Sequence, residues 1–407
     1  MTRTRSWRSL VFSEVGILIL LALARIALLL LNNLQYGWHR DELDMLDNAQ
    51  ALAWGYVSYP PVAPLVARIA LVLFGPSLLG VRLFASLAMA AVMVLAGLIA
   101  RELGGGRLAQ MVAAVATGIS PIQLLAGTLF SYSSFDCLWW VLTAYLMIRL
   151  LKSGDARGWL AIGLVFGLGM MTKYLFAVLI AGVIIGVLLT PARRFLRSPW
   201  LWAGAAIALV MCLPNLMWQV QHDFISLEFM RGIHARDILI GRTASFVPEQ
   251  FYFSANLATI PLWVVGLVTF IVGHRGRKYR ILAWMYVVPL ALLMFLQGRS
   301  YYLAPAYPML IAAGAVVTEA WFARLSPGRS RVARSALYGA LALGGLAFAA
   351  IALPIAPVGS AWWDVASDLN GELPEMIGWP ELVQTVADIY ASLPEAEQAR
   401  AAIITRN

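Results

Sequence analysis

The run HRDE at residues 39–42 places two adjacent carboxylates beside two basic side chains. It follows an apolar stretch between residues 8 and 32, which is long enough to cross a bilayer because about 20 helical residues span the hydrocarbon core. Ionisable groups are costly to keep at a membrane boundary, so they are functional candidates. We therefore expect Asp41 and Glu42 to stand just beyond the first membrane span.

The composition predicts an all-α polytopic membrane protein. Apolar residues make up 61% of the 407 residues and charged residues only 13%, which is far from the balance of a soluble globule. Cys137 and Cys212 lie in or beside apolar helices without disulfide or metal-ligand spacing. The apolar N-terminal stretch lacks a convincing cleavage pattern, so we interpret it as a retained helix rather than a signal peptide.

Apolar stretches predict eleven membrane spans. They fall near residues 13–32, 78–100, 108–127, 136–151, 157–172, 174–190, 200–217, 257–273, 281–297, 303–322 and 335–354. With a cytoplasmic N-terminus, 18 of the 30 basic residues fall in the N-terminal segment and the inner loops. The net charge of +9 is thus a topology signal, and it requires no nucleic acid. Two short helices over 157–190, meeting at Thr172-Lys173, keep the basic cluster at residue 193 inside and Lys173 outside.

The outer segments are candidates for the site. A transmembrane unit over 1–354 is predicted, with a first outer loop at 33–77, a second at 218–256, and a short acidic outer tail at 355–407. Helical spacing of apolar residues after Asp41 predicts an amphipathic surface helix. The apolar run at 62–74 is too short to span and suits an interfacial helix. Arg25 lies in the middle of the first span and must face a partner or water.

Several motifs, in order from residue 36 to residue 308, carry a resemblance. They include YGWHRDELDML, LAWGYVSYPPVAPLVARI, SFDCLWWVLTAYL, GLGMMTKY, LPNLMWQ and GRSYYLAPAYPML. The chain resembles the bacterial family 39 glycosyltransferases, which are similar to protein O-mannosyltransferases and lipid A aminoarabinose transferases. The resemblance implies the C-type membrane glycosyltransferase fold, a bundle of about 11 transmembrane helices with juxtamembrane helices in the first outer loop. It also implies a sugar donor linked to a polyprenyl phosphate.

The resemblance implies roles for three carboxylates. Asp41 matches the family's acidic position in the first outer loop and is expected to act as the general base, with Glu42 orienting the acceptor or Asp41. Asp136 matches a second acidic position and could join Asp41 in binding Mg, Mn or Zn or in stabilising charge on the sugar. The alternatives are that Asp41 caps the following helix and that Asp136 favourably meets a helix dipole. No cofactor other than this candidate metal is implied.

A departing phosphate needs cationic ligands. Arg82 matches a family arginine and is the first candidate, followed by Lys173, Arg299 and Arg40. Arg82 could instead snorkel to the headgroups. Candidate substrate contacts are Tyr59, Tyr301 and Tyr302, the last two alternatively forming part of an interfacial aromatic belt. We interpret His39 as a surface hydrogen-bonding group.

The predicted function is transfer of a sugar from a polyprenyl-phosphate donor to a cell-envelope acceptor, which could be a lipid, a glycan or a protein hydroxyl. The predicted location is the bacterial inner membrane, with the site and the C-terminus on the periplasmic side, among membrane lipids. The alternatives are a transporter or flippase of a lipid-linked sugar and an inactive scaffold. Transporters typically show repeated halves around a midplane charge, whereas here the acids gather at one face. Turnover of a lipid-linked donor would discriminate the enzyme from the other two.

Overall fold

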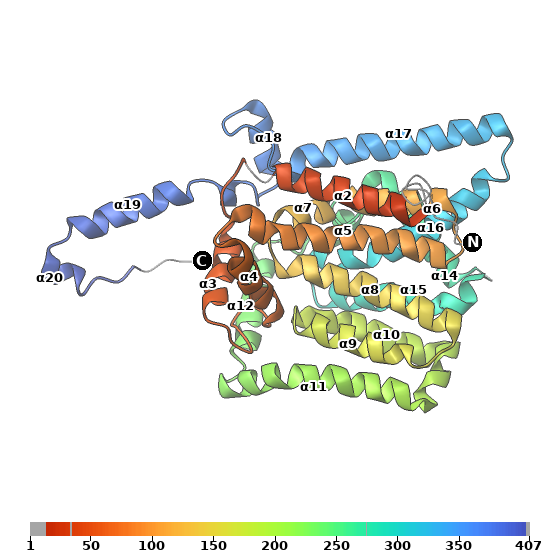
Figure 1. Cartoon of the computed structure of the whole chain (residues 1–407), viewed down its shortest axis with the longest axis horizontal. Helices are drawn as coiled ribbons and strands as arrows, with labels where there is room; N and C mark the ends of the chain where they lie inside the picture. The colour runs from red at the N-terminus through yellow and green to blue at the C-terminus, as the bar shows by residue number, and fades with distance from the viewer. Residues whose placement is uncertain (1–13, 33–34, 274, 404–407) are drawn as a thin grey trace, which may run out of the picture.

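In the computed structural model, residues 14–32, 35–273 and 275–403 are described, and all their regular elements are helical (Figure 1). The first half contains α2 (Glu14–Asn32), α3 (Arg40–Gln50), α4 (Val62–Phe74), α5 (Leu78–Glu102), α6 (Arg107–Gly118), α7 (Pro121–Thr128), α8 (Tyr132–Ser153), α9 (Gly158–Met170) and α10 (Ala177–Leu189). The second contains α11 (Pro199–Gln221), α12 (Ile225–Leu239), α13 (Phe246–Tyr252), α14 (Ile260–Ile271), α15 (Arg280–Phe295), α16 (Tyr307–Phe322), α17 (Pro327–Ala352), α18 (Ala361–Leu369), α19 (Trp379–Ser392) and α20 (Glu395–Gln398). Short 3-10 turns join several of them.

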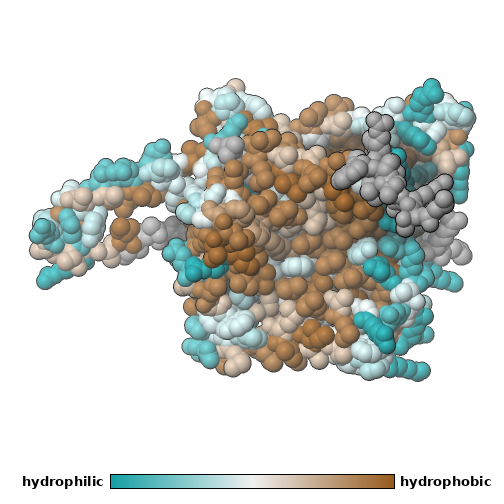
Figure 2. Space-filling model, viewed as in Figure 1, coloured by the Kyte–Doolittle hydropathy of each residue, from teal (hydrophilic) through white to brown (hydrophobic). Residues whose placement is uncertain are grey.

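Long apolar helices form the body of the molecule. By length and composition, seven described helices could cross a membrane, or up to ten if each bent pair is one span. The one predicted span left over, 157–172, coincides with α9, whose 13 residues fall short of that length. Two short helices, α9 and α10, do replace one long helix over 157–190, as predicted. Figure 2 shows an apolar belt across the middle of the molecule with hydrophilic residues at its two ends, so the protein is an integral membrane protein.

Glycines allow two pairs of helices to pack at backbone contact. A Cβ on Gly163 of α9 would clash with the backbone of Gly204 in α11, and one on Gly266 of α14 would clash with the Leu310 carbonyl of α16. Small residues permit such close approach in membrane bundles, where packing rather than the hydrophobic effect drives association. These contacts hold α11 and α14 against the body of the bundle.

Arg25 of α2 is buried against a broken helix. The helix axis bends by 65° between α6 and α7, which frees backbone carbonyls from their helical partners. The Arg25 guanidinium donates to the carbonyls of Gly118, at 2.7 Å, and Gln123, at 2.5 Å. The partner that the sequence requires but does not identify is therefore the backbone at this break.

The two ends of the bundle are built differently. At one end the loops meet through Lys152 Nζ and Glu102 Oε2, 2.8 Å apart, and through a hydrogen bond from the Gly106 amide to Glu319. At the other end lie α3, α4, α12 and the C-terminal helices (Figure 1). Both outer-loop regions and the tail thus meet at one end.

The first part of the tail packs on the first outer loop. Tyr36 and Leu129 form a small buried cluster with the tail residues Ala356, Leu373 and Met376, among others. The Gly37 amide donates to the Met376 carbonyl at 3.1 Å. Helix α19, in contrast, has no buried residue and projects away from the bundle (Figure 1).

We expect cysteine labelling to place these two ends on opposite sides of the membrane. In a variant without Cys137 and Cys212, a cysteine at Asp47 should react with an impermeant reagent added to intact cells, whereas one at Arg193 should react only after lysis. The reason is that basic residues gather in the loops at the Arg193 end, and the cytoplasmic loops of membrane proteins are enriched in such residues. Labelling of position 193 from outside would reverse the orientation of the later loops.

Candidate functional site

At the start of α3 the cap is formed by His39 and Glu42, not by Asp41. Nδ1 of His39 accepts the Asp41 amide hydrogen at 3.1 Å, and the His39 amide donates to Glu42 Oε2 at 2.9 Å. This reciprocal arrangement is a capping box. The Asp41 side chain, 54% exposed, therefore does not cap the helix, and that alternative is wrong. The interpretation of His39 as a surface group is also wrong, since only 1% of the residue is exposed.

Glu42 and Arg82 form a fully buried ion pair. Arg82 donates from Nε to Oε1 at 2.8 Å and from Nη2 to Oε2 at 2.7 Å. The Glu42 carboxylate also accepts from the amides of His39, at 2.9 Å, and Phe130, at 2.8 Å. One carboxylate thus ties together the first outer loop, α5 and the segment before α8.

This pair bears on the roles predicted for Arg82 and Glu42. Arg82 uses Nε and Nη2 on Glu42, and its Nη1 is buried without a hydrogen-bond partner, so the guanidinium offers no exposed surface to a phosphate and this arrangement argues against Arg82 as a phosphate ligand. Arg82 also does not snorkel to the lipid headgroups, because its side chain is buried within the protein. Glu42 has no exposed surface with which to contact an acceptor, and the other predicted role, orienting Asp41, is the one that fits its position.

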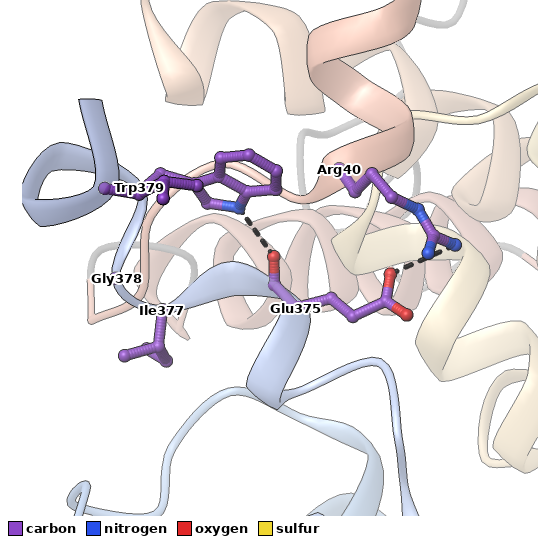
Figure 3. Close-up of a pocket in the computed structure, with 6 residues that line it drawn as sticks. Arg40, Glu375, Ile377, Gly378 and Trp379 are labelled. Carbon is purple, nitrogen blue, oxygen red and sulfur yellow. Dashed lines mark hydrogen bonds and ion pairs between the residues drawn. The ribbon is translucent and has the colours of Figure 1, made fainter. Parts of the chain in front are cut away.

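Arg40 joins Asp41 to the tail. Its Nη2 lies 3.2 Å from Glu375 Oε2 (Figure 3). Its Nε lies 3.3 Å from Asp41 Oδ1. The Arg40 side chain is 45% exposed. Arg40, a candidate phosphate ligand from the sequence, thus neutralises two neighbouring carboxylates in this arrangement.

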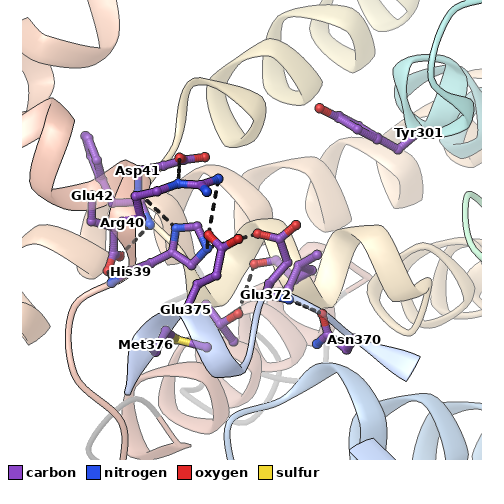
Figure 4. A network of polar contacts seen from close by, with 12 residues as sticks. His39, Arg40, Asp41, Glu42, Tyr301, Asn370, Glu372, Glu375 and Met376 are labelled. Carbon is purple, nitrogen blue, oxygen red and sulfur yellow. Dashed lines mark hydrogen bonds and ion pairs between the residues drawn. The ribbon is translucent and has the colours of Figure 1, made fainter. Parts of the chain in front are cut away.

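His39 lies between two glutamates of the tail. Its Nε2 is 3.0 Å from Glu372 Oε2 and 3.2 Å from Glu375 Oε2 (Figure 4). The hydrogen bond from His39 holds the pKa of Glu372 below its usual range. Burial raises the pKa of Glu375 despite the nearby Arg40. The tail is thereby fastened to the residue that caps α3.

These three residues are close enough to hold a metal ion, because their ligand atoms lie within 4.8 Å of one another. The hydrogen bonding of the imidazole decides against it in this arrangement. Since Nδ1 accepts the Asp41 amide hydrogen, a neutral ring carries its own hydrogen on Nε2. A metal on Nε2 would move that hydrogen to Nδ1, where it would face the amide. In this arrangement the Nε2 hydrogen of His39 therefore faces the two glutamates.

Asp136 and Lys173 meet near the same end of the bundle. Lys173 Nζ lies 3.5 Å from Asp136 Oδ2, and both residues are buried. Three tyrosine rings surround the ammonium group, with ring centroids at 4.5 Å for Tyr302, 5.3 Å for Tyr132 and 5.5 Å for Tyr301. Cation–π attraction and the carboxylate thus hold the lysine charge in place. Asp136 contacts Lys173 through Oδ2 alone, and its Oδ1 is buried without a hydrogen-bond partner. Among the described residues, the group close enough to hold a metal is His39, Glu372 and Glu375, so this geometry gives no separate support to a metal shared by Asp41 and Asp136.

Arg299 extends this group of cations. Its Nε donates to Asp237 Oδ2 of α12 at 2.6 Å, and its Nη1 donates to the Tyr301 hydroxyl at 3.4 Å. Burial alone would raise the pKa of Asp237, but the hydrogen bond and the charge of Arg299 outweigh burial, so the pKa of Asp237 is lowered. Tyr301 therefore connects Arg299 to Lys173. Its hydroxyl end points toward the cluster that contains Asp41 and Glu372 (Figure 4).

Tyr132, which sequence reasoning missed, lies at the centre. Asp41, Asp136 and Arg299 all lie close enough to interact with it electrostatically. Its ring packs on Tyr59, with centroids 5.8 Å apart. A signal was present, since Tyr132 precedes Asp136 by four residues and lies on the same helix face.

Tyr59 packs against Tyr132 and is itself buried. Its hydroxyl donates to Asp44 Oδ2 at 2.5 Å and accepts from Asn48 at 2.7 Å, and only 4% of the residue is exposed. A direct contact with substrate, as predicted, is not favoured by this burial. The site therefore combines the exposed carboxylate of Asp41 with two cations, Lys173 and Arg299, each of which contacts a carboxylate. Tyr132, Tyr301 and Tyr302 surround the Lys173 ammonium group. This combination can remove a proton on one side and stabilise an anion on the other.

Sequence comparison identifies related membrane enzymes. Residues 58–218 match the sequence model of the family described as dolichyl-phosphate-mannose-protein mannosyltransferase. The lipid A galacturonosyltransferase RgtD of Rhizobium johnstonii is 29% identical over 290 residues, which cover 70% of this chain and 60% of that protein. The chain thus matches less than two thirds of this relative's length.

Solved structures share the fold. ArnT from Cupriavidus metallidurans, bound to undecaprenyl phosphate, superposes with a TM-score of 0.64 at 16% identity, covering 94% of this chain and 82% of that one. The Archaeoglobus fulgidus oligosaccharyltransferase gives a TM-score of 0.56 at 12% identity, with coverage of 90% and 58%. The resemblance predicted from the motifs is confirmed, and the chain has the fold of the C-type membrane glycosyltransferases.

Proposed function

We propose that this protein is a membrane glycosyltransferase that moves a sugar from a polyprenyl-phosphate donor to a cell-envelope acceptor. The observation that carries the proposal is the exposed carboxylate of Asp41 at the same end of the bundle as the ammonium group of Lys173, which Asp136 and three tyrosine rings surround. The similarity to a lipid A galacturonosyltransferase and the fold shared with a protein that binds undecaprenyl phosphate support it. The first also favours a glycolipid acceptor of the lipid A type.

The proposed mechanism divides the work between two groups of side chains. Asp41 takes the proton from the acceptor hydroxyl as that oxygen attacks the anomeric carbon. The bond from the anomeric carbon to the phosphate oxygen breaks, and the phosphate leaves with the electron pair. Lys173 and Arg299 stabilise the charge of the departing polyprenyl phosphate. Tyr301 and Tyr302 hold these cations and line the donor side.

The proposed setting is the inner membrane of a bacterium, with the Asp41 end facing the periplasm. The segregation of basic residues supports this orientation. No described residue cluster at the middle of the bundle resembles a carboxylate-based transport site, which supports an enzyme over a flippase.

Replacing Lys173 with methionine should raise the donor KM and lower kcat, together reducing kcat/KM at least about tenfold. A phosphate is charged in both the ground state and the transition state, so loss of one cation weakens both. Lys152→Met is the matched control, because Lys152 pairs with Glu102 at the opposite end of the bundle. Equal kinetics for the two variants would remove Lys173 from the donor site.

Analysis of the envelope glycolipids of cells that produce the protein tests the proposed sugar transfer. Cells that carry only the Asp41→Asn protein should lack one sugar on an envelope glycolipid and retain the polyprenyl-phosphate sugar, as measured by mass spectrometry. Cells that carry the wild-type protein should contain the completed glycolipid. Identical glycolipids in both strains would contradict the proposed transfer. Accumulation of the donor on the cytoplasmic side alone would indicate a flippase.

A further inference from the structure

A cavity lies between the start of α3 and the C-terminal tail. Its volume is about 220 Å³, and it is lined by Arg40, Glu375, Ile377, Gly378, Trp379 and Leu382 (Figure 3). Five of these six residues belong to the tail, outside the motifs that carry the family resemblance. One aromatic ring, one guanidinium and one carboxylate in an otherwise apolar hollow are typical of a small-molecule site.

The tail wall of this cavity is fixed in place. The Trp379 indole donates to the Glu375 carbonyl at 2.8 Å, which sets the orientation of the ring. Glu372 contacts buried His39, and the Met376 carbonyl accepts from the Gly37 amide. Gly378 has a φ of +86° and open space where a Cβ would stand. Glycine adopts this conformation readily, and Gly378, Trp379 and Arg40 line the same cavity.

The charges around the cavity disfavour the binding of an anionic ligand. Arg40 is the one cation among its lining residues, and it already contacts two carboxylates, Asp41 and Glu375. Glu372 adds a third carboxylate beside Glu375 through their shared partner His39. A phosphate or carboxylate ligand would meet net repulsion here. An uncharged group rich in hydroxyls would find both donors and acceptors.

We propose that this cavity is a saccharide-binding subsite for the acceptor, an inference that rests on the proposed function. The Trp379 ring stacks on the apolar face of a sugar ring, while Glu375 accepts hydrogen bonds from hydroxyls and Arg40 donates them. Arg40 contacts both this cavity and Asp41. A sugar bound in the cavity thus lies beside the proposed base, and the tail contributes to the choice of acceptor.

Direct binding tests the subsite without requiring turnover. Full-length protein in detergent is titrated with uncharged disaccharides of glucose, galactose and N-acetylglucosamine, and separately with a hexose phosphate, and Kd is measured by calorimetry. At least one uncharged disaccharide should bind more tightly than the hexose phosphate. Trp379→Ala should weaken that binding at least about tenfold, and Trp379→Phe should restore much of it because a ring remains.

Trp362→Ala is the matched control. Trp362 also lies in the tail and donates its indole hydrogen to a backbone carbonyl, that of Ala350 at 2.9 Å, but it does not line the cavity. Its removal should leave the disaccharide Kd unchanged. Tighter binding of the hexose phosphate, an equal loss in both tryptophan variants, or no disaccharide binding by a wild-type protein that turns over its donor would overturn the subsite. Absence of donor turnover in the wild type would instead count against the proposed function.

Discussion

Asp41→Asn is expected to lower kcat at least about a hundredfold, the range for loss of a general base. The donor KM should change little, because the amide preserves the shape of the side chain and the caged Lys173 is untouched. The capping box does not use the Asp41 carboxylate, so helix α3 should remain intact. Steady-state kinetics with an identified donor and acceptor, together with the apparent Tm, measure both effects.

Asp47→Asn is the control for this experiment, since Asp47 is an exposed aspartate on the same helix. Its kinetics and Tm should match those of the wild type. If Asp41→Asn retains near-normal turnover, Asp41 is not the base. The search would then turn to Asp136, because one of its carboxylate oxygens, Oδ1, has no hydrogen-bond partner, whereas both oxygens of Glu42 are hydrogen-bonded.

Breaking the Glu42–Arg82 pair should produce the largest loss of stability. In Glu42→Gln, Arg82 is left as a buried charge without its counter-ion, and removal of one partner of such a pair typically costs about 3–5 kcal/mol. The amides of His39 and Phe130 lose their charged acceptor as well. We expect a marked fall in apparent Tm and in the yield of folded protein, measured by thermal scanning in detergent.

Two variants separate this effect from loss of a donor contact. Lys152→Met removes an exposed pair, which typically contributes less than about 1 kcal/mol, and should leave the Tm nearly unchanged. Arg82→Lys keeps the charge but loses the bidentate contact with Glu42. This variant should therefore lower the Tm, while the protein that remains folded keeps the wild-type donor KM. A raised donor KM at unchanged Tm would restore Arg82 as a phosphate ligand.

The sequence predicts much of the fold because membrane helices have a strong local signal. Apolar length places nearly every span, and the short helix at Val62–Phe74 has the predicted bounds. Charge segregation resolves 157–190 into α9 and α10. The break between α6 and α7 is not predicted. Its free backbone carbonyls accept hydrogen bonds from Arg25, which lies more than 90 positions earlier in the chain.

Side-chain partners are harder to predict than elements. Arg82 matches a helix position that suits a phosphate ligand, yet its partner Glu42 lies 40 residues earlier in the chain. His39 reads as a surface residue because the glutamates that bury it lie in the tail, more than 330 residues later. Such pairings depend on tertiary packing, for which periodicity and local motifs give no signal. Asp41, Lys173 and Arg299 need no distant partner to be recognised as candidates, and the structure places them at one end.

Turnover of a defined donor tests the central proposal most directly. Purified protein in detergent is mixed with a polyprenyl-phosphate sugar, labelled in the sugar, and an envelope glycolipid that lacks it. Equal amounts of labelled glycolipid and free polyprenyl phosphate should form, and Asp41→Asn should form neither at a comparable rate. Retention of the sugar on the polyprenyl phosphate across a panel of donors and acceptors, by a protein that binds those donors, would contradict the account.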